Sequence, residues 1–304
     1  MKIVFMGSPD FAIPSLEKLI ASGHEITAVV SNPDKRRGRG GGTSPTPVKA
    51  KALEAGLPVI SIDNLKADAF AEELKALEAD LFVVVAFRIL PRHVLEIPSK
   101  GSVNLHASLL PKYRGAAPIH WAIMNGEEKT GCTVFFLDEK VDTGAIIKQE
   151  ATPIGPNETT GDLYERLKNM GSELLLESIN EIEDGSCTLT PQDHSKATPA
   201  PKLFTEDCRV DFDNPAGEIH NKIRGLSPFP TAWAELDDLK FNMYRSRVAQ
   251  TSRLKPGEIG LKDDEMLVGT RDRDLVLDEV QIQGKKRMSG KDFMNGYSGT
   301  GIIH

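Results

Sequence analysis

Cysteine is scarce in this sequence, with only three among 304 residues and no CxxC pair. Cys132, Cys187 and Cys208 are too few and too far apart for a disulfide framework or a cysteine-based structural zinc, and they indicate a reducing compartment. No apolar run approaches the ~18 residues that a membrane span requires. Because the strand-like run KIVFMG starts at the second residue, we expect no signal or transit peptide and predict a cytoplasmic location.

Two nucleotide-binding signatures are also missing. GSPDFAIPS follows the first expected strand but has no G-x-G-x-x-G, so the dinucleotide fingerprint is absent. Its Ser8-Pro9-Asp10 step is explained as a helix start. The Gly-rich RRGRGGGTSP at 36–45 lacks the Lys-Ser/Thr ending of a P-loop. Its default interpretation is a flexible arm whose basic charge suits phosphates.

Positive charge is in the minority, since the net charge is −7. The basic side chains nevertheless form three local clusters along the chain: Lys35, Arg36, Arg37 and Arg39; Arg245, Arg247, Arg253 and Lys255; and Lys285, Lys286 and Arg287. Each cluster alone is best explained as a solvated loop. Together they are compatible with a polyanionic partner without requiring one.

A length of 304 residues is enough for two domains. The first half alternates helical patterns with short apolar runs, which predict strands at 2–7, 25–31, 80–87, 101–108 and 131–138. DLFVVVAF at 80–87 is typical of a strand buried on both faces of a parallel sheet. The alternation predicts an α/β domain with a doubly wound, Rossmann-like parallel sheet. A long amphipathic helix at 159–185 closes it.

The second half has a different pattern. A polar segment at 186–206 with three prolines is typical of an extended linker. Beyond it lie short strand-like runs separated by turn signals: TAWAEL, FNMYRSRVA, PGEIG, MLVGT and DLVLDEVQI. Such spacing predicts a small, OB-like β-barrel. We therefore expect a catalytic domain at 1–185, a linker at 186–206 and a C-terminal barrel at 207–304.

NLHASLLPKYRG at 104–115 places an Asn and a His two positions apart at the end of an expected strand. Side chains at i and i+2 of a strand share one face, and ligands of open α/β sheets bind beyond the carboxyl ends of the strands. The amide of Asn104 and the imidazole of His106 together suit an oxyanion. A buried His bonded to a backbone carbonyl is the more frequent explanation of such a residue.

A carboxylate follows in DEKVDTGAI at 138–146. Asp142 near His106 would fix the tautomer of the imidazole and favour its protonated form. The alternative is a turn former that hydrogen-bonds its own backbone. Cys132 is better explained as a packed strand residue than as a nucleophile.

The run NLHASLLPKYRGAAPIHWAIMNGEEKTGCTV followed by DEKVDTG resembles the signature of the folate-dependent formyltransferases. That signature has an Asn, a His two residues later, a Ser-Leu-Leu-Pro step and an Asp some thirty-six residues after the His, as here (142 − 106 = 36). MGSPDFAIPSL at 6–16 and the loop at 31–49 are further similar to the branch of this family that formylates initiator methionyl-tRNA. The resemblance extends over essentially the whole chain, including PFPTAW.

The resemblance implies a formyl transfer from 10-formyltetrahydrofolate, without a metal, in which Asn104, His106 and Asp142 form the catalytic set. It places Ser108, Leu109, Leu110 and Pro111 along the folate pocket. AFRILP at 86–91 is one residue shorter than the stretch usual in the tRNA branch. It is similar to the related glycinamide ribonucleotide transformylases, which places Arg88, Ile89 and Leu90 along the same pocket.

The resemblance also implies that the loop with Arg39 meets the acceptor end of the tRNA, with Asp10 and Phe11 near the aminoacyl group. The expected tRNA-binding residues are Lys35, Arg36, Arg37, Arg39, Arg245, Arg247, Lys285 and Lys286. We expect a monomer. Two alternatives stay open: a formyltransferase for an amino-sugar nucleotide or glycinamide ribonucleotide, which needs neither the basic loop nor the second domain, and a catalytically idle RNA-binding protein.

Overall fold

The computed structural model describes residues 1–37, 42–250 and 253–304. It contains two compact units whose segments interleave along the chain. The first unit comprises Met1–Gly115, Gly131–Thr152 and Tyr164–Pro199, and the second comprises Ala116–Thr130, Pro153–Leu163 and Ala200–His304. The domain limits expected at 185 and 207 stay a prediction.

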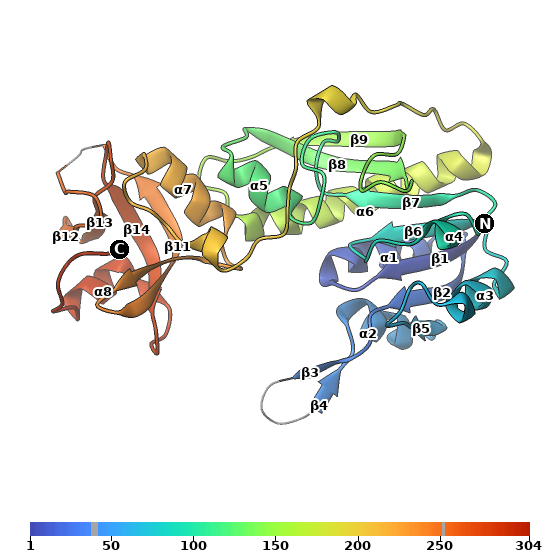
Figure 1. The fold of residues 1–304 in the computed structure, drawn as a ribbon, viewed down its shortest axis with the longest axis horizontal. Coiled ribbons are helices and arrows are strands. Elements are labelled where there is room, and N and C mark those ends of the chain that lie inside the picture. The colour runs from blue at the N-terminus through green and yellow to red at the C-terminus, as the bar shows by residue number, and fades with distance from the viewer. Residues whose placement is uncertain (38–41, 251–252) are drawn as a thin grey trace. The chain divides into compact units, whose positions relative to one another are not determined.

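The first unit is built on a seven-stranded sheet in the order β5-β2-β1-β6-β7-β8-β9 (Figure 1). Its strands are β1 (Lys2–Gly7), β2 (Glu25–Ser31), β5 (Val59–Ser61), β6 (Leu81–Val85), β7 (Ser102–His106), β8 (Lys129–Phe136) and β9 (Ile146–Pro153). The pairs from β5 to β7 are parallel, whereas β8 runs antiparallel to β7. The Rossmann-like parallel sheet is thus confirmed, with an antiparallel strand added beside it.

The helices follow the strands as the alternation predicts. They are α1 (Ile13–Ala21), α2 (Pro47–Glu54), α3 (Asp68–Ala76), α4 (Arg92–Leu95) and α6 (Thr160–Asp184), with short 3-10 turns η1 (Asp10–Ala12) and η2 (His194–Lys196). Side chains of α3 and α4 pack on one face of β1 and β6 in a single buried cluster. The sheet is buried because helical side chains cover its apolar rows.

Helix α6 fixes the orientation of β7. A Cβ on Gly171 of α6 would lie 3.0 Å from both the Leu105 side chain and the Cys132 Sγ, so the helix approaches β7 and β8 closely there. Because side chains alternate along a strand, Asn104 and His106 point to the face opposite Leu105. They therefore point away from α6.

Some strands of the first unit were not predicted. β3 (Lys35–Arg37) and β4 (Gly42–Ser44) form a two-stranded antiparallel hairpin that extends away from the seven-stranded sheet (Figure 1). β5 is only three residues long, and in β9 only the first two residues are buried. Edge strands of this kind carry no apolar run, so hydrophobic periodicity does not identify them.

The second unit contains a six-stranded sheet in the order β10-β11-β14-β13-β12, with β15 paired to β14. The strands are β10 (Ala232–Leu236), β11 (Leu239–Val248), β12 (Ile259–Lys262), β13 (Glu265–Val268), β14 (Leu275–Ile282) and β15 (Met288–Ser289). The described pairings of β10 to β15 are antiparallel. Each predicted strand-like run lies on one of them.

The final residues join the two edges of this sheet. Ile303 bridges Leu236 of β10, and Ile302 bridges Glu258 next to β12. Reciprocal backbone hydrogen bonds of 2.8 Å between Glu235 and His304 reinforce the first junction. The β-barrel character predicted from the sequence therefore depends on a C-terminal segment that has no apolar run of its own.

Helices α5 (Pro118–Met124), α7 (Ala216–Gly225) and α8 (Gly290–Asn295) and the turn η3 (Glu206–Cys208) complete the second unit. A Cβ on Gly225 of α7 would lie 2.6 Å from the Met124 side chain, so α5 and α7 are in close contact. Met124 also packs against the barrel core. None of these helices was predicted.

The segment predicted as an extended linker, 186–206, is bonded to the first unit over part of its length. Thr190 bridges Ile146 of β9, and Pro199 bridges Arg114. Between them, Gln192 is buried. The proline and polar content of the segment gave no sign of these contacts.

Candidate active site

Asn104 and His106 lie at the carboxyl end of β7. Since β1, β6 and β7 are adjacent and parallel, their carboxyl ends meet at one edge of the sheet. Asp10 follows β1 and Arg88 follows β6, so the sequence-predicted residues of three segments share this edge. This is where an open α/β sheet binds its ligand.

The two ring nitrogens of His106 have different neighbours. Nε2 lies 2.8 Å from the carbonyl oxygen of Tyr113. A carbonyl only accepts, so Nε2 carries a proton and donates it. Nδ1 lies 3.8 Å from Oδ2 of Asp142, and both side chains are buried. Nδ1 is therefore the ring nitrogen that faces the Asp142 carboxylate.

The loop of Asp142 is tied to the loop that follows β7. Oδ2 of Asp142 accepts a 2.8 Å hydrogen bond from the backbone N–H of Gly115. Asp142 and Tyr113 both have left-handed backbone, with φ of 55° and 60°. This conformation is costly for residues other than glycine and persists where the surroundings fix it. The carboxylate and the Tyr113 carbonyl thus hold the imidazole from both sides.

The frequent alternative for His106, a bond to a backbone carbonyl, is accordingly present at Nε2. It accounts for only one of the two nitrogens. The other alternative, Asp142 as a turn former that bonds its own backbone, does not match the bond to Gly115, which is 27 residues away. The carboxylate is directed between loops and toward the imidazole.

Asn104 presents an amide without an internal partner. Its side chain is half-buried, and within residues 1–37, 42–250 and 253–304 no hydrogen bond of this amide is found. A partly desolvated amide normally finds a partner, from the protein, water or a ligand. Its two N–H groups are available on the face that also carries His106.

The predicted folate-pocket loop after β7 is internally bonded. The hydroxyl of Ser108 donates to the carbonyl of Lys112 at 2.7 Å, and Thr133 donates to the Ser108 carbonyl at 2.6 Å. The backbone N–H of Leu110 donates to Thr133 Oγ1 at 3.1 Å. Leu110 is buried, whereas Leu109 and Pro111 are half-buried. These bonds join the loop to itself and to β8, and its role at a folate stays a prediction.

The second stretch predicted for the pocket follows β6, and its three residues have different environments in the structure. The guanidinium of Arg88 donates to the carbonyl oxygens of Asp63, at 2.6 Å, and Ile62. Leu90 is buried in the core under α3 and α4, whereas Ile89 is 72% exposed. Only Ile89 offers a large apolar surface for contact, and all three assignments stay predictions.

Asp10 and Phe11, expected near the aminoacyl group, are held by helix α6. Asp10 accepts a 2.8 Å hydrogen bond from the Tyr164 hydroxyl, and Lys168 lies 3.9 Å from its other oxygen. The ring of Phe11 packs edge-on against Tyr164. Burial is the main cause of a raised pKa of Tyr164, and the hydrogen bond to Asp10 raises this pKa further. Tyr164 was not predicted, because it lies inside an amphipathic helix that carries no motif.

The predicted tRNA-binding residues differ in their surroundings. Lys35, Arg36 and Arg37 lie on β3, and Arg39 lies outside the described residues. Arg245 is 3.9 Å from both Asp162 and Glu279. Arg247 forms 2.9 Å ion pairs with Glu265 and Asp278. Lys285 and Lys286 are exposed, with no ion pair found in the described part of the chain. Their contacts with RNA stay a prediction.

Cys132 is a packed residue of β8. It is fully buried, and burial raises the pKa of its thiol to about 12. A thiol with so high a pKa is not a nucleophile at neutral pH. Among the described residues no group of three His, Cys, Asp or Glu could hold a metal ion, and no helix is long and apolar enough to cross a membrane.

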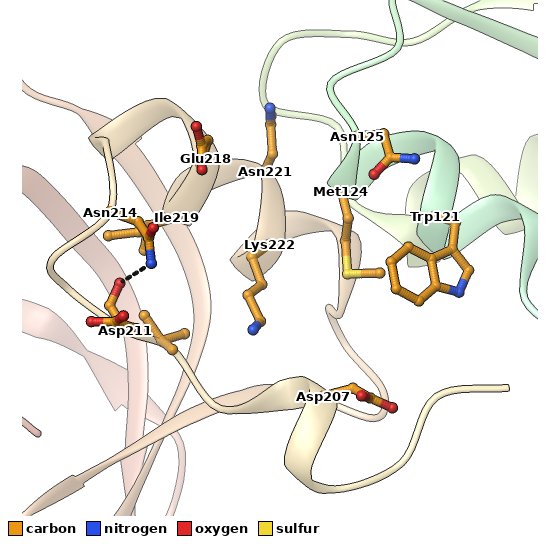
Figure 2. Close-up of a pocket in the computed structure, with 11 residues that line it drawn as sticks. Trp121, Met124, Asn125, Asp207, Asp211, Asn214, Glu218, Ile219, Asn221 and Lys222 are labelled. Carbon is orange, nitrogen blue, oxygen red and sulfur yellow. Dashed lines mark hydrogen bonds between the residues drawn. The ribbon is translucent and has the colours of Figure 1, made fainter. Parts of the chain in front are cut away.

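A separate pocket of about 760 Å³ lies within the second unit, between α5, α7 and the turn η3 (Figure 2). Its lining includes Trp121 and Met124 on one side and the carboxylates of Asp207 and Glu218. Lys222 donates to the Arg209 carbonyl at 2.6 Å, and burial lowers the pKa of its amine. No sequence motif indicated this pocket.

Comparisons with known proteins identify the family of the chain. The family model "Formyl transferase" matches residues 1–179, and "Formyl transferase, C-terminal domain" matches residues 202–298. A protein of Porphyromonas gingivalis strain W83 named methionyl-tRNA formyltransferase is 42% identical, over 98% of this chain and 96% of that relative. One of the same name from Alkaliphilus oremlandii is 44% identical, over 97% and 96%.

Solved structures with the same fold are more distant in sequence. WlaRD, described as a sugar 3N-formyl transferase and crystallised with dTDP and 5-N-formyl-THF, superimposes with a TM-score of 0.69 at 21% identity. The match covers 94% of this chain and 99% of that one. At this identity the likeness establishes the fold alone.

Proposed function

This chain belongs to the formyl transferase family, and on that basis we propose that it transfers the formyl group of 10-formyltetrahydrofolate to the amino group of initiator methionyl-tRNA. The observation that carries the proposal is the arrangement of Asn104, His106 and Asp142 at the carboxyl edge of β7. The names and near-complete coverage of the relatives support the acceptor.

The reaction moves one carbon between two nitrogens. The free amine of the methionyl group attacks the formyl carbon, a C–N bond forms, and the carbonyl electron pair moves onto oxygen. When the tetrahedral intermediate collapses, the bond from carbon to N10 breaks and N10 takes a proton. The attacking nitrogen loses one proton, so the products are formyl-methionyl-tRNA and tetrahydrofolate.

The residues at the edge of β7 act on the charge that develops on oxygen. The amide of Asn104, for which the described residues provide no hydrogen-bond partner, donates an N–H to the oxyanion. The protonated Nδ1 of His106 supplies positive charge beside it, and Asp142, 3.8 Å away, stabilises that charge. Donors fixed in place before the reaction lower the barrier because they need no reorganisation.

The acceptor determines what the second unit does. A macromolecular acceptor explains why the chain carries a barrel with exposed Lys285 and Lys286 in addition to the sheet that bears the site. The barrel alone does not exclude a small acceptor, because the match to WlaRD, a sugar 3N-formyl transferase, covers 94% of this chain. The tRNA acceptor is inferred from the relatives named methionyl-tRNA formyltransferase. Protein–RNA affinity of this kind arises from phosphate contacts and is strongly dependent on salt.

The direct test is a formyl-transfer assay with charged initiator tRNA, beside an amino-sugar nucleotide and glycinamide ribonucleotide as alternative acceptors. We expect transfer to the tRNA only. A rate on a small acceptor equal to or above that on tRNA would refute the proposed substrate. His106→Ala should abolish transfer and leave tRNA binding unchanged, which separates the enzyme from an RNA-binding protein with the same fold.

A second experiment separates the two binding functions. The double substitution Lys285→Ala with Lys286→Ala should weaken tRNA binding and lower the slope of log affinity against log salt by about 2 if both contact phosphates. Folate binding should not change. Arg39→Ala is expected to act in the same way, and an equal loss of tRNA and folate binding would contradict this division.

A further inference from the structure

Gln192 connects the two loops that hold His106. Its Nε2 donates to the carbonyl of Asp142 at 3.0 Å and to that of Gly144 at 2.8 Å. Its Oε1 accepts from Nη2 of Arg114 at 2.6 Å and from Nε at 3.2 Å. Both amide N–H groups and the amide oxygen are therefore used, on a side chain that is 8% exposed.

Both loops contain a strained residue next to the imidazole. Asp142, with φ of 55°, bears the carboxylate near Nδ1, and Tyr113, with φ of 60°, bears the carbonyl bonded to Nε2. Gln192 donates to the carbonyl of Asp142 itself and accepts from the side chain of Arg114, the residue after Tyr113. Such backbone persists only where neighbouring groups fix it.

The same segment also reaches the Tyr113 loop through its backbone. Thr198 accepts from the Tyr113 N–H at 2.9 Å through its hydroxyl, and from the Arg114 N–H at 2.9 Å through its carbonyl. On its other side the Asp142 loop lies close to β8 at Gly144, where a Cβ would lie 1.8 Å from the Phe136 carbonyl oxygen. The loop is thus enclosed between β8 and Gln192.

We propose that Gln192 is a positioning residue for formyl transfer: it holds the Asp142 carboxylate and the Tyr113 carbonyl in the positions from which they orient the His106 ring and stabilise its positive charge. The inference rests on the proposed function for its kinetic consequence, because Gln192 touches none of the reacting atoms. It assigns the predicted linker a part in the active site.

Gln192→Glu is the sharpest variant. It keeps an oxygen for Arg114 but cannot donate to the carbonyls of Asp142 and Gly144, so the Asp142 loop alone is released. Gln192→Asn, one methylene shorter, keeps the amide but cannot span both loops. The matched control is Ser195→Ala in the same segment, because Ser195 is exposed and, of the residues that the structure describes, its hydroxyl bonds Asp193 alone.

Two readouts are measured on the full chain. In the formyl-transfer assay, both Gln192 variants should lower kcat by about 10- to 100-fold, as expected for a sub-ångström to 1 Å misplacement, with KM for both substrates nearly unchanged. In NMR spectra of histidine-labelled protein without substrates, the His106 ring signals should shift in both variants and stay in place in Ser195→Ala. Substitution of a residue that only stabilises the fold would lower Tm without lowering kcat at unchanged KM and without shifting the His106 signals.

The outcomes are distinguishable. If the natural chain does not transfer formyl groups, the proposed function fails, and the NMR comparison still decides whether Gln192 sets the environment of His106. If a Gln192 variant is folded, keeps kcat within about threefold and shows unshifted His106 signals, the inference is overturned. If Gln192→Glu does not fold, the same two criteria apply to Gln192→Asn.

Discussion

Replacing Asp142 by Asn tests the electrostatic part of the mechanism directly. The substitution removes one negative charge 3.8 Å from Nδ1 of His106 in a buried setting. Two unit charges about 4 Å apart interact by about 4 kcal/mol at an effective dielectric constant of 20. The side-chain oxygen of Asn can still accept from the Gly115 N–H, so the loop is expected to keep its conformation.

Each 1.36 kcal/mol of barrier is a tenfold change in rate, so about 4 kcal/mol sets a ceiling near 10³. We expect kcat to fall by about 10²- to 10³-fold in single-turnover formyl transfer, with tRNA binding unchanged. The control is Glu139→Gln, which removes an exposed charge of the same loop paired with Arg92 and should have little effect. A folded Asp142→Asn enzyme with kcat within about threefold of the natural chain would refute the assigned role.

Three further predictions concern the site and the second unit, which contains both tryptophans of the chain, so that fluorescence reports its unfolding. Asn104→Ala should lower kcat by about 10²- to 10³-fold, with little change in Tm because its amide bonds to no other group in the described parts of the chain, and a large drop in Tm would contradict this. Ile303→Ala should cost about 2–5 kcal/mol in urea unfolding, since Ile303 is buried at the barrel seam. Burial lowers the pKa of His220 from its ordinary value of 6.5, so the unfolded chain binds the proton at a higher pH than the folded chain, and the free energy of unfolding falls as pH drops below about 6.5. In His220→Asn this pH dependence should weaken. An unchanged slope of unfolding free energy against pH would refute the assignment.

The fold class was predictable because its strongest signals are local. The apolar runs at 2–7 and 25–31 coincide with β1 and β2, and their alternation with helices restricts the topology to a few parallel arrangements. The expected helix at 159–185 agrees with α6 to within one residue at each end. The antiparallel direction of β8 was not predictable, because direction depends on the connection and not on the apolar pattern.

The candidate site was predictable where a short spacing encodes it. Asn104 and His106 share a strand face because they are two residues apart, a relation that holds without tertiary information. Asp142 was indicated by its distance along the chain in the family signature, whereas the Tyr113 carbonyl and the Gly115 N–H are backbone groups that carry no side-chain signal. Gln192 lies in a polar, proline-containing stretch, and its role depends on contacts with residues about 50 and 80 positions away.

The interleaved path of the chain limits how this protein can be dissected. Helix α7 meets α5, whose residues precede β8 in the sequence. A recombinant piece consisting of 207–304 alone would leave the Met124-facing side of α7 bare and expose apolar surface to water. Cleavage of the chain next to Gln192, within 186–206, would in turn break the segment that holds this side chain between the Asp142 and Tyr113 loops. Truncated forms of either half would therefore lack part of their own packing, and point substitutions in the full chain are the better test of each unit.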